Sequence, residues 1–188
     1  SRKAVLNKKG KMQTMLCSCF PGPDTTVVGT QDGSLYLFKG YQLATNMRKA
    51  HAVTHAVHAT RDMVISGGKE GKVKFWTVDL MQCLKEVVIS HPQAIGSCIK
   101  SMHLSGSMLL LGTRSGEIYE MDTTSYSHEL LLQGHGYGTV WGLATHPSEH
   151  QMVTVGDDCT VRVWDLAARR MVMVRDLGAR GRSAAYHP

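Results

Sequence analysis

The stretch GDDCTVRVWDL, residues 156–166, decides the fold of this chain. It sets two adjacent carboxylates, Asp157 and Asp158, beside Cys159 and then alternates valines with other residues up to Trp164. Paired carboxylates invite a catalytic or metal-binding interpretation. A polar pair in front of alternating β-branched residues is instead typical of a turn that leads into a strand. The rest of the chain decides between these two interpretations.

Three other stretches share the pattern of the first one. They are GTQDGSLYLF from Gly29, GGKEGKVKFW from Gly67 and GTRSGEIYEM from Gly112. The leading glycines at 29, 67, 112 and 156 are separated by 38, 45 and 44 residues, a spacing typical of propeller blades and solenoid repeats. Each unit has two short strands around a Gly-containing turn, and the second of them closes on an aromatic residue or Met. Helical periodicity is weak throughout.

We therefore predict an all-β fold, a fragment of a β-propeller with about four consecutive four-stranded blades, open rather than closed. In the fourth unit the strands are expected at 139–145, 151–155, 160–165 and 170–176. The expected division is 1–10 for the outer strand of a preceding blade, 11–50, 51–90, 91–134 and 135–178 for the four blades, and 179–188 for the start of a following blade.

The fourth unit carries a recognisable polar set. Gly134-His135 precedes Trp164-Asp165, with Thr154 and Asp158 between them, and this arrangement resembles the WD40 repeat. The resemblance implies a buried chain of hydrogen bonds from Trp164 through Thr154 and His135 to Asp158. In the second unit the matching residues are His51, Ser66, Glu70 and Trp76. Asp158 is therefore interpreted as a structural turn residue, and catalysis or metal binding by it is the disfavoured alternative.

Longer stretches resemble one WD40 family, the echinoderm microtubule-associated protein-like proteins. They are NKKGKMQTMLCSCF (7–20), GTQDGSLYLFKG (29–40), SGGKEGKVKFW (66–76), LLGTRSGEIYEMD (110–122) and GHGYGTVWGLATHP (134–147). The resemblance is greatest to the long members, which contain several successive propeller units. It implies a non-enzymatic cytoskeletal scaffold that binds tubulin or microtubules and modulates their dynamics. The hydrophobic HELP motif of the family is not among these residues.

Composition narrows the class of protein further. The net charge of +6 favours acidic partners, and no run of apolar residues has the length of a transmembrane helix or the flanks of a signal peptide. The five scattered cysteines fit a reducing compartment. Together with the family resemblance, this predicts a location in the cytoplasm, at the cytoskeleton, and no membrane partner.

Other chemistry is weakly indicated. His55 and His58 differ by an odd number of positions, so on one strand they point to opposite faces and cannot share a metal. Cys17 and Cys19 share a face, but no second cysteine pair completes a zinc site. No nucleophile has a neighbouring base in a known pattern, and no phosphate-binding loop appears. We expect no catalytic residue, cofactor, metal or small-molecule substrate, and we disfavour nucleic acid because aromatic platforms are lacking.

Protein binding is the remaining function. The turns between second and third strands, and the connections between units, should gather at one rim of the propeller. The candidate residues for partner binding on this rim are Arg48, Lys49, Lys69, Arg114, Tyr137 and Asp157. The alternative to a microtubule-binding scaffold is a general WD40 adaptor for another multiprotein complex, with the same fold and a different rim.

Overall fold

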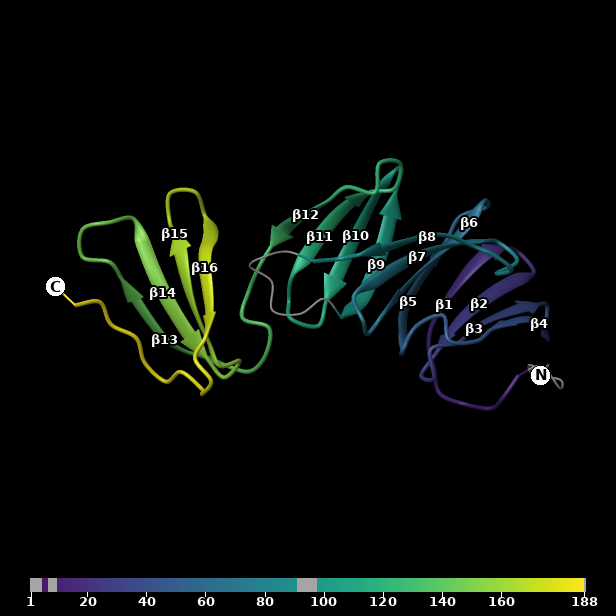
Figure 1. The fold of residues 1–188 in the computed structure, drawn as a ribbon, viewed down its shortest axis with the longest axis horizontal. Coiled ribbons are helices and arrows are strands. Elements are labelled where there is room, and N and C mark those ends of the chain that lie inside the picture. Colours follow the sequence, from purple (N-terminus) through teal and green to yellow (C-terminus); the bar gives the residue numbers. More distant parts are fainter. Residues whose placement is uncertain (1–4, 7–9, 91–97, 188) are drawn as a thin grey trace.

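The computed structural model describes residues 5–6, 10–90 and 98–187, and their strands form four separate sheets (Figure 1). Sixteen strands are present among the described residues, and none of these residues is helical. In every sheet the four strands are antiparallel and follow one another in chain order. The prediction of an all-β fold made of open four-stranded units is confirmed.

The first two sheets are regular meanders. The first sheet consists of β1 (Met15–Gly22), β2 (Thr25–Thr30), β3 (Leu35–Lys39) and β4 (Gln42–Met47). The second consists of β5 (Thr54–Ala59), β6 (Met63–Gly68), β7 (Lys72–Thr77) and β8 (Cys83–Val88). Gly33 and Gly71 have φ values of 82° and 73° in the turns between second and third strands, a conformation that glycine adopts at little cost.

The third and fourth sheets follow the same plan. The third sheet consists of β9 (Ile99–Ser105), β10 (Met108–Thr113), β11 (Ile118–Asp122) and β12 (His128–Leu132). The fourth consists of β13 (Val140–Thr145), β14 (Gln151–Gly156), β15 (Thr160–Asp165) and β16 (Arg170–Asp176). Each strand of the fourth sheet begins and ends within one residue of its expected position.

The choice of Gly156 as the counterpart of Gly29, Gly67 and Gly112 is wrong by one position. Gly67 pairs with Ala56 and Val73, whereas Gly156 pairs with Val140, as Gly68 pairs with Thr54. The residue of the fourth sheet that corresponds to Gly67 is therefore Val155, one position earlier than the glycine chosen from the sequence. Gly68 is the true counterpart of Gly156, but it follows Gly67 directly, so the shift by one residue could not be seen in the sequence.

The apolar core lies between neighbouring sheets. One cluster joins Val27, Leu35 and Leu37 of the first sheet to Val64 and Trp76 of the second. A further cluster joins the other face of the second sheet to the third, and its buried members are Ala56, Ile65, Val73, Phe75, Ile89, Ile99, Leu109, Leu111, Tyr119 and Met121. Because successive side chains of a strand point to opposite faces, the second sheet is covered on both sides.

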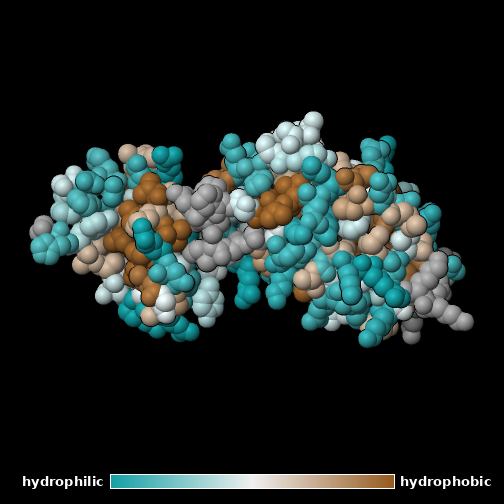
Figure 2. Space-filling view, in the orientation of Figure 1, coloured by the Kyte–Doolittle hydropathy of each residue, from teal (hydrophilic) through white to brown (hydrophobic). Residues whose placement is uncertain are grey.

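The fourth sheet lies apart from the third (Figure 1). Strand β5 packs against β1, and β9 packs against β5, but no extensive contact of this kind joins β13 to β9 within the described residues. Val140, Trp141 and Leu143 of β13 are exposed as a result. Figure 2 shows hydrophobic side chains gathered on the surface of this sheet.

The ends of the chain lie against the outermost sheets. Val5 forms an isolated parallel bridge with Gln42 at the edge of the first sheet. The C-terminal segment 177–187 contains no strand, and it lies beside β13, where Arg182 covers the ring of Trp141 and Tyr186 contacts His146. Among the described residues, no helix is long and apolar enough to cross a membrane.

Candidate functional site

The polar residues of the fourth sheet form one continuous hydrogen-bond chain. Trp164 Nε1 donates to Thr154 Oγ1 at 2.8 Å, and His135 Nε2 lies 2.8 Å from the same hydroxyl. His135 Nδ1 lies 2.9 Å from Asp158 Oδ1. A neutral imidazole with its proton on Nδ1 satisfies every member, because the Thr154 hydroxyl then donates to Nε2 and Nδ1 donates to the carboxylate. The chain links the loop before β13 to the middle strands of the sheet.

Asp158 has further partners in the loop before β13 and in its own turn. The backbone N–H of Gly136 donates to Oδ2 at 3.3 Å, and the hydroxyl of Thr160 donates to Oδ1 at 2.9 Å. Burial acts to raise the pKa of Asp158, but hydrogen bonds from His135 and Thr160 outweigh it, so the pKa lies below its usual value. The carboxylate is ionised and surrounded by donors. This arrangement suits a structural anchor better than a proton acceptor for catalysis.

The second sheet has a parallel arrangement. Trp76 Nε1 donates to Ser66 Oγ at 2.8 Å, and His51 Nε2 lies 2.7 Å from the same oxygen. His51 Nδ1 contacts the Glu70 carboxylate, whose second oxygen accepts from the backbone N–H of Ala52 at 3.2 Å. Burial lowers the pKa of His51, even though Glu70 acts in the opposite direction. The longer glutamate therefore fills the role that Asp158 has in the fourth sheet.

Arg162 is a buried polar residue that the motif analysis missed. Its side chain is on β15, and the residue is only 1% exposed. Its Nε donates to Thr160 Oγ1 at 3.2 Å, and Nη2 lies 3.5 Å from Asp158 Oδ2. Strand alternation was the available signal, because residues 160, 162 and 164 share a face of the strand and Trp164 belongs to the hydrogen-bond chain.

The six rim candidates lie on turns and connections at one edge of the sheets. In all four sheets the turn after the second strand is tied to the segment that enters the sheet by the same backbone hydrogen bond. The four bonds run from Gln31 N to Thr14 O at 3.0 Å, from Lys69 N to Val53 O at 3.1 Å, from Arg114 N to Cys98 O at 2.8 Å and from Asp157 N to Thr139 O at 3.0 Å. This repeated hydrogen bond holds each turn against the segment that leads into the first strand of the same sheet.

The rim candidates do not form a single cluster. Arg48 and Lys49 border one cavity beside the first sheet, and Arg114 and Tyr137 border another beside the hairpin of the fourth sheet. Lys69 lines neither of these cavities. The side chains of Arg48, Lys49, Lys69, Arg114 and Tyr137 are exposed.

Asp157 differs from the other rim candidates because its carboxylate has partners within the chain. It accepts from the backbone N–H of Thr139 at 3.1 Å, and it pairs with Arg182 at 3.4 Å. The hydrogen bond from Thr139 lowers the pKa of Asp157 below its usual value, although partial burial opposes this. Among the six candidates, the exposed charges without such partners in the described part of the chain are therefore the four cationic ones, Arg48, Lys49, Lys69 and Arg114.

The residues considered for metal binding have other neighbours. His55 lies 3.0 Å from the Lys100 ammonium, and His58 packs edge to face on His103 at 5.8 Å. Burial raises the pKa of Cys17 to about 11 and that of Cys19 to about 12, so neither thiol ionises at neutral pH. Within the described ranges, no group of three or more His, Cys, Asp or Glu residues could hold a metal ion.

Comparison with known proteins agrees with the geometry. The family described as "WD domain, G-beta repeat" matches residues 126–165. Echinoderm microtubule-associated protein-like 2 is 32% identical in Homo sapiens and 31% in Mus musculus, each over the whole of this chain and 29% of the relative. The ciliary WD repeat-containing protein ctxp80 of Euplotoides octocarinatus is 26% identical over 94% of this chain and 24% of that protein.

These relatives are considerably longer than the chain, which spans about 29% of the length of the first of them. The similarity nevertheless extends over all four sheets and is not confined to the one repeat that the family description matches. The chain is therefore similar over its whole length to the echinoderm microtubule-associated protein-like proteins, and its fourth unit, which contains the hydrogen-bond chain, matches the WD repeat.

Proposed function

We propose that this chain is part of a non-enzymatic scaffold in a microtubule-associated WD-repeat protein, that it binds tubulin through its basic rim and that it modulates microtubule dynamics. The observation that carries the proposal is the similarity of the whole chain to echinoderm microtubule-associated protein-like 2. A location in the cytoplasm, at the cytoskeleton, follows from this proposal. The fold alone would not support it, because propellers serve many functions.

The roles of the polar residues speak against an enzymatic function. His51, Glu70, His135 and Asp158 are the residues whose types suit acid–base chemistry, and each is engaged in holding a turn to a sheet. A base that is engaged in structural hydrogen bonds is poorly placed to take a proton from a substrate. Binding through the exposed rim is the function that leaves these interactions intact.

The charge of the rim supports an acidic protein partner. Arg48, Lys49, Lys69 and Arg114 are exposed, while Asp157 is engaged by Thr139 and Arg182. Tyr137 adds an aromatic ring that is 62% exposed. Exposed charges of one sign steer an oppositely charged partner and raise the association rate in a salt-dependent manner.

Co-sedimentation with microtubules tests the proposal. Reversing two rim charges, Lys69→Glu with Arg114→Glu, should weaken binding roughly fivefold to tenfold at low salt, because each lost contact is replaced by repulsion. The matched control is Lys39→Glu with Arg61→Glu, which reverses two exposed charges at the opposite edge of the sheets. Equal binding by the rim variant and the wild type would contradict the proposal. Loss of binding in both double variants would indicate non-specific attraction instead of a rim site.

A further inference from the structure

The connection between third and fourth strands contains a residue with left-handed backbone in each sheet. In the first sheet this residue is Gly40, with φ of 58°. In the second, third and fourth sheets it is Leu80, Tyr126 and Arg169, with φ values of 60°, 61° and 51°. Residues other than glycine adopt this conformation at a cost of about 1 kcal/mol. Because three of the four residues have large side chains, the position of each side chain determines what it packs against.

In two sheets this residue closes the space toward the preceding sheet. Leu80 is 0% exposed and belongs to the apolar cluster between the first and second sheets. Tyr126 of the third sheet packs edge to face on Phe75 of the second, with ring centroids 5.1 Å apart. An apolar side chain at this position therefore seals the outer part of the joint between two sheets.

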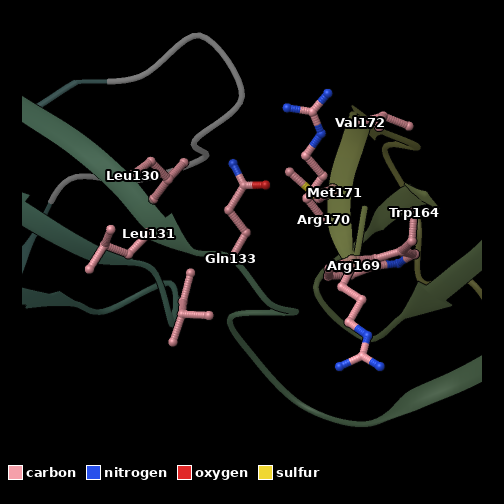
Figure 3. Close-up of a pocket in the computed structure, with 9 residues that line it drawn as sticks. Leu130, Leu131, Gln133, Trp164, Arg169, Arg170, Met171 and Val172 are labelled. Carbon is pink, nitrogen blue, oxygen red and sulfur yellow. The ribbon is translucent and has the colours of Figure 1, made fainter. Parts of the chain in front are cut away.

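The fourth sheet has a cation at the same position. Arg169 and Arg170 border a groove of about 540 Å³ between the outer strands of the third and fourth sheets. The other residues that line it are Leu130, Leu131, Leu132, Gln133, Trp164, Met171 and Val172. Figure 3 shows the leucines on the side of the third sheet and the two arginines on the side of the fourth, with Gln133 between them.

The groove is apolar on one side and positively charged on the other. Its lining contains no carboxylate, and neither Arg169 nor Arg170 has an ion-pair partner among the described residues. Leu131 and Leu132 are exposed, and Trp164 is more exposed than its counterpart Trp76, which lies in the closed joint between the first two sheets. A buried leucine or tyrosine would have covered these residues. An arginine leaves them open and adds positive charge.

The edges of the groove suit an extended chain. Strand β12 ends the third sheet and β16 ends the fourth, so each has one side without a neighbouring strand within the described residues. An extended peptide presents side chains to alternate sides with a period of two residues, and it can pair with the edge of a sheet. Alternating apolar and acidic residues would place the former on the leucines and the latter beside the arginines.

We propose that the groove between β12 and β16 is a docking site for an extended acidic polypeptide segment whose apolar and acidic residues alternate. The arginines attract acidic side chains, and the leucines on the opposite side of the groove accommodate apolar ones. An extended segment presents its side chains alternately to these two sides. A basic or purely apolar segment would leave Arg169 and Arg170 without a partner as they lose water. This site is distinct from the rim, and the inference does not depend on tubulin being the partner of the rim.

Fluorescence anisotropy with labelled synthetic peptides tests the docking site on the whole chain. The probe is a fluorescein-labelled peptide of about eight residues in which Glu and Leu alternate. The matched probe has Lys in place of each Glu. We expect saturable, salt-sensitive binding of the Glu–Leu peptide and at least about tenfold weaker binding of the Lys–Leu peptide.

Variants locate the binding. Leu132→Glu places a carboxylate in the groove and should weaken binding of the Glu–Leu peptide at least about fivefold. Leu84→Glu is the control, because Leu84 is 52% exposed on the outer strand of the second sheet and Leu132 is 59% exposed. Arg169→Gly removes one charge and relieves the left-handed conformation, so it should bind less peptide while remaining folded, as circular dichroism would verify.

The outcomes separate clearly. Weaker binding by both groove variants with unchanged binding by Leu84→Glu supports the site. Equal affinity for the two peptides, or unchanged affinity in Arg169→Gly and Leu132→Glu, overturns it. Sedimentation velocity supplies one more result: concentration-dependent dimers that the groove variants abolish would show a second copy of the chain as the occupant, and would also overturn the proposal. Microtubule binding by the rim variants is measured separately and fails or succeeds independently.

Discussion

Thr154 shows how one side chain can hold a sheet together. Its hydroxyl accepts from Trp164 and lies within hydrogen-bonding distance of His135, so it joins β14 and β15 to the loop that precedes β13. The residue is buried, which excludes water as a replacement partner. A buried donor without an acceptor costs more than a hydrogen bond contributes when it is made. The middle of this hydrogen-bond chain is therefore its most sensitive point.

Substituting Thr154→Val tests this reasoning. Valine has nearly the same shape but cannot accept from Trp164 or donate to His135, so the free energy of unfolding should fall by about 1 to 3 kcal/mol. Urea denaturation followed by tryptophan fluorescence gives the value. The control is Thr145→Val on β13, where the side chain is exposed and a change within about 0.5 kcal/mol is expected. Similar losses in both variants would contradict the special position of Thr154.

Some residues could be placed from the sequence and others could not. The geometry around Trp164 and Asp158 follows from spacing, because the motif residues lie at set positions of one meander. Arg162 was missed although it shares a strand face with Trp164, since a charged residue on a strand is ordinarily exposed. Its burial depends on Asp158 and Thr160 supplying partners, and that requires knowledge of the folded hairpin.

The turn residues and the alternation of apolar with polar residues were sufficient to predict the bounds of the strands in the fourth sheet. Thr160–Asp165 and Arg170–Asp176 were expected at the same bounds, and β13 and β14 each differ from expectation by one residue at one end. The separation of the fourth sheet from the third was not expected. The alternation of apolar and polar residues within one unit indicates whether a face of its sheet is apolar. It does not indicate which neighbouring sheet covers that face. The exposed residues of β13 read like core residues for this reason.

The second sheet has a pH dependence that follows from His51. Its pKa is lowered from 6.5 by burial, so the unfolded chain binds more protons than the folded chain once the pH falls below about 6.5. The stabilisation is complete above this pH and is lost as the pH falls toward the lower pKa of the folded state. A second loss begins below about 4.5. Burial acts to raise the pKa of Glu70, but hydrogen bonds from its own backbone N–H, from His51 and from the backbone of Ala52 outweigh it, so the pKa lies below 4.5.

Urea denaturation at a series of pH values measures this effect. The free energy of unfolding of the wild type should decrease between about pH 6.5 and one unit below it, and His51→Gln should show a smaller slope. Some slope remains, because the pKa values of His55 and His58 are also lowered by burial. His150→Gln, at an exposed position, is the control. A slope in His51→Gln equal to that of the wild type would refute the assignment.

The whole molecule is stabilised by the stacking of its sheets. Each unit has a sheet too small to bury its apolar residues alone, and the first three sheets solve this by covering one another. The fourth contributes only Val155 and Met171 to the buried apolar residues among those described. Its surface therefore keeps apolar residues in contact with water, as Figure 2 shows.

Self-association of the isolated chain is the expected result. Val140 and Leu143 of β13 are exposed, and apolar side chains on an uncovered sheet promote association. Replacing both residues by Ser should reduce concentration-dependent light scattering at neutral pH. The control is Met81→Ser, because Met81 is 70% exposed in a turn and outside any sheet face. Scattering that persists unchanged in the β13 variant would indicate that another surface drives association.

The order of the strands also bears on how the polypeptide is made. Every sheet is built from four consecutive strands, so each one is complete as soon as roughly forty residues have left the ribosome. A newly made sheet then waits only for the next to cover it, and folding proceeds from the amino end in step with translation. If the ribosome pauses between two units, only the apolar face of the last completed sheet is exposed, and chaperones would have to protect one such face at a time.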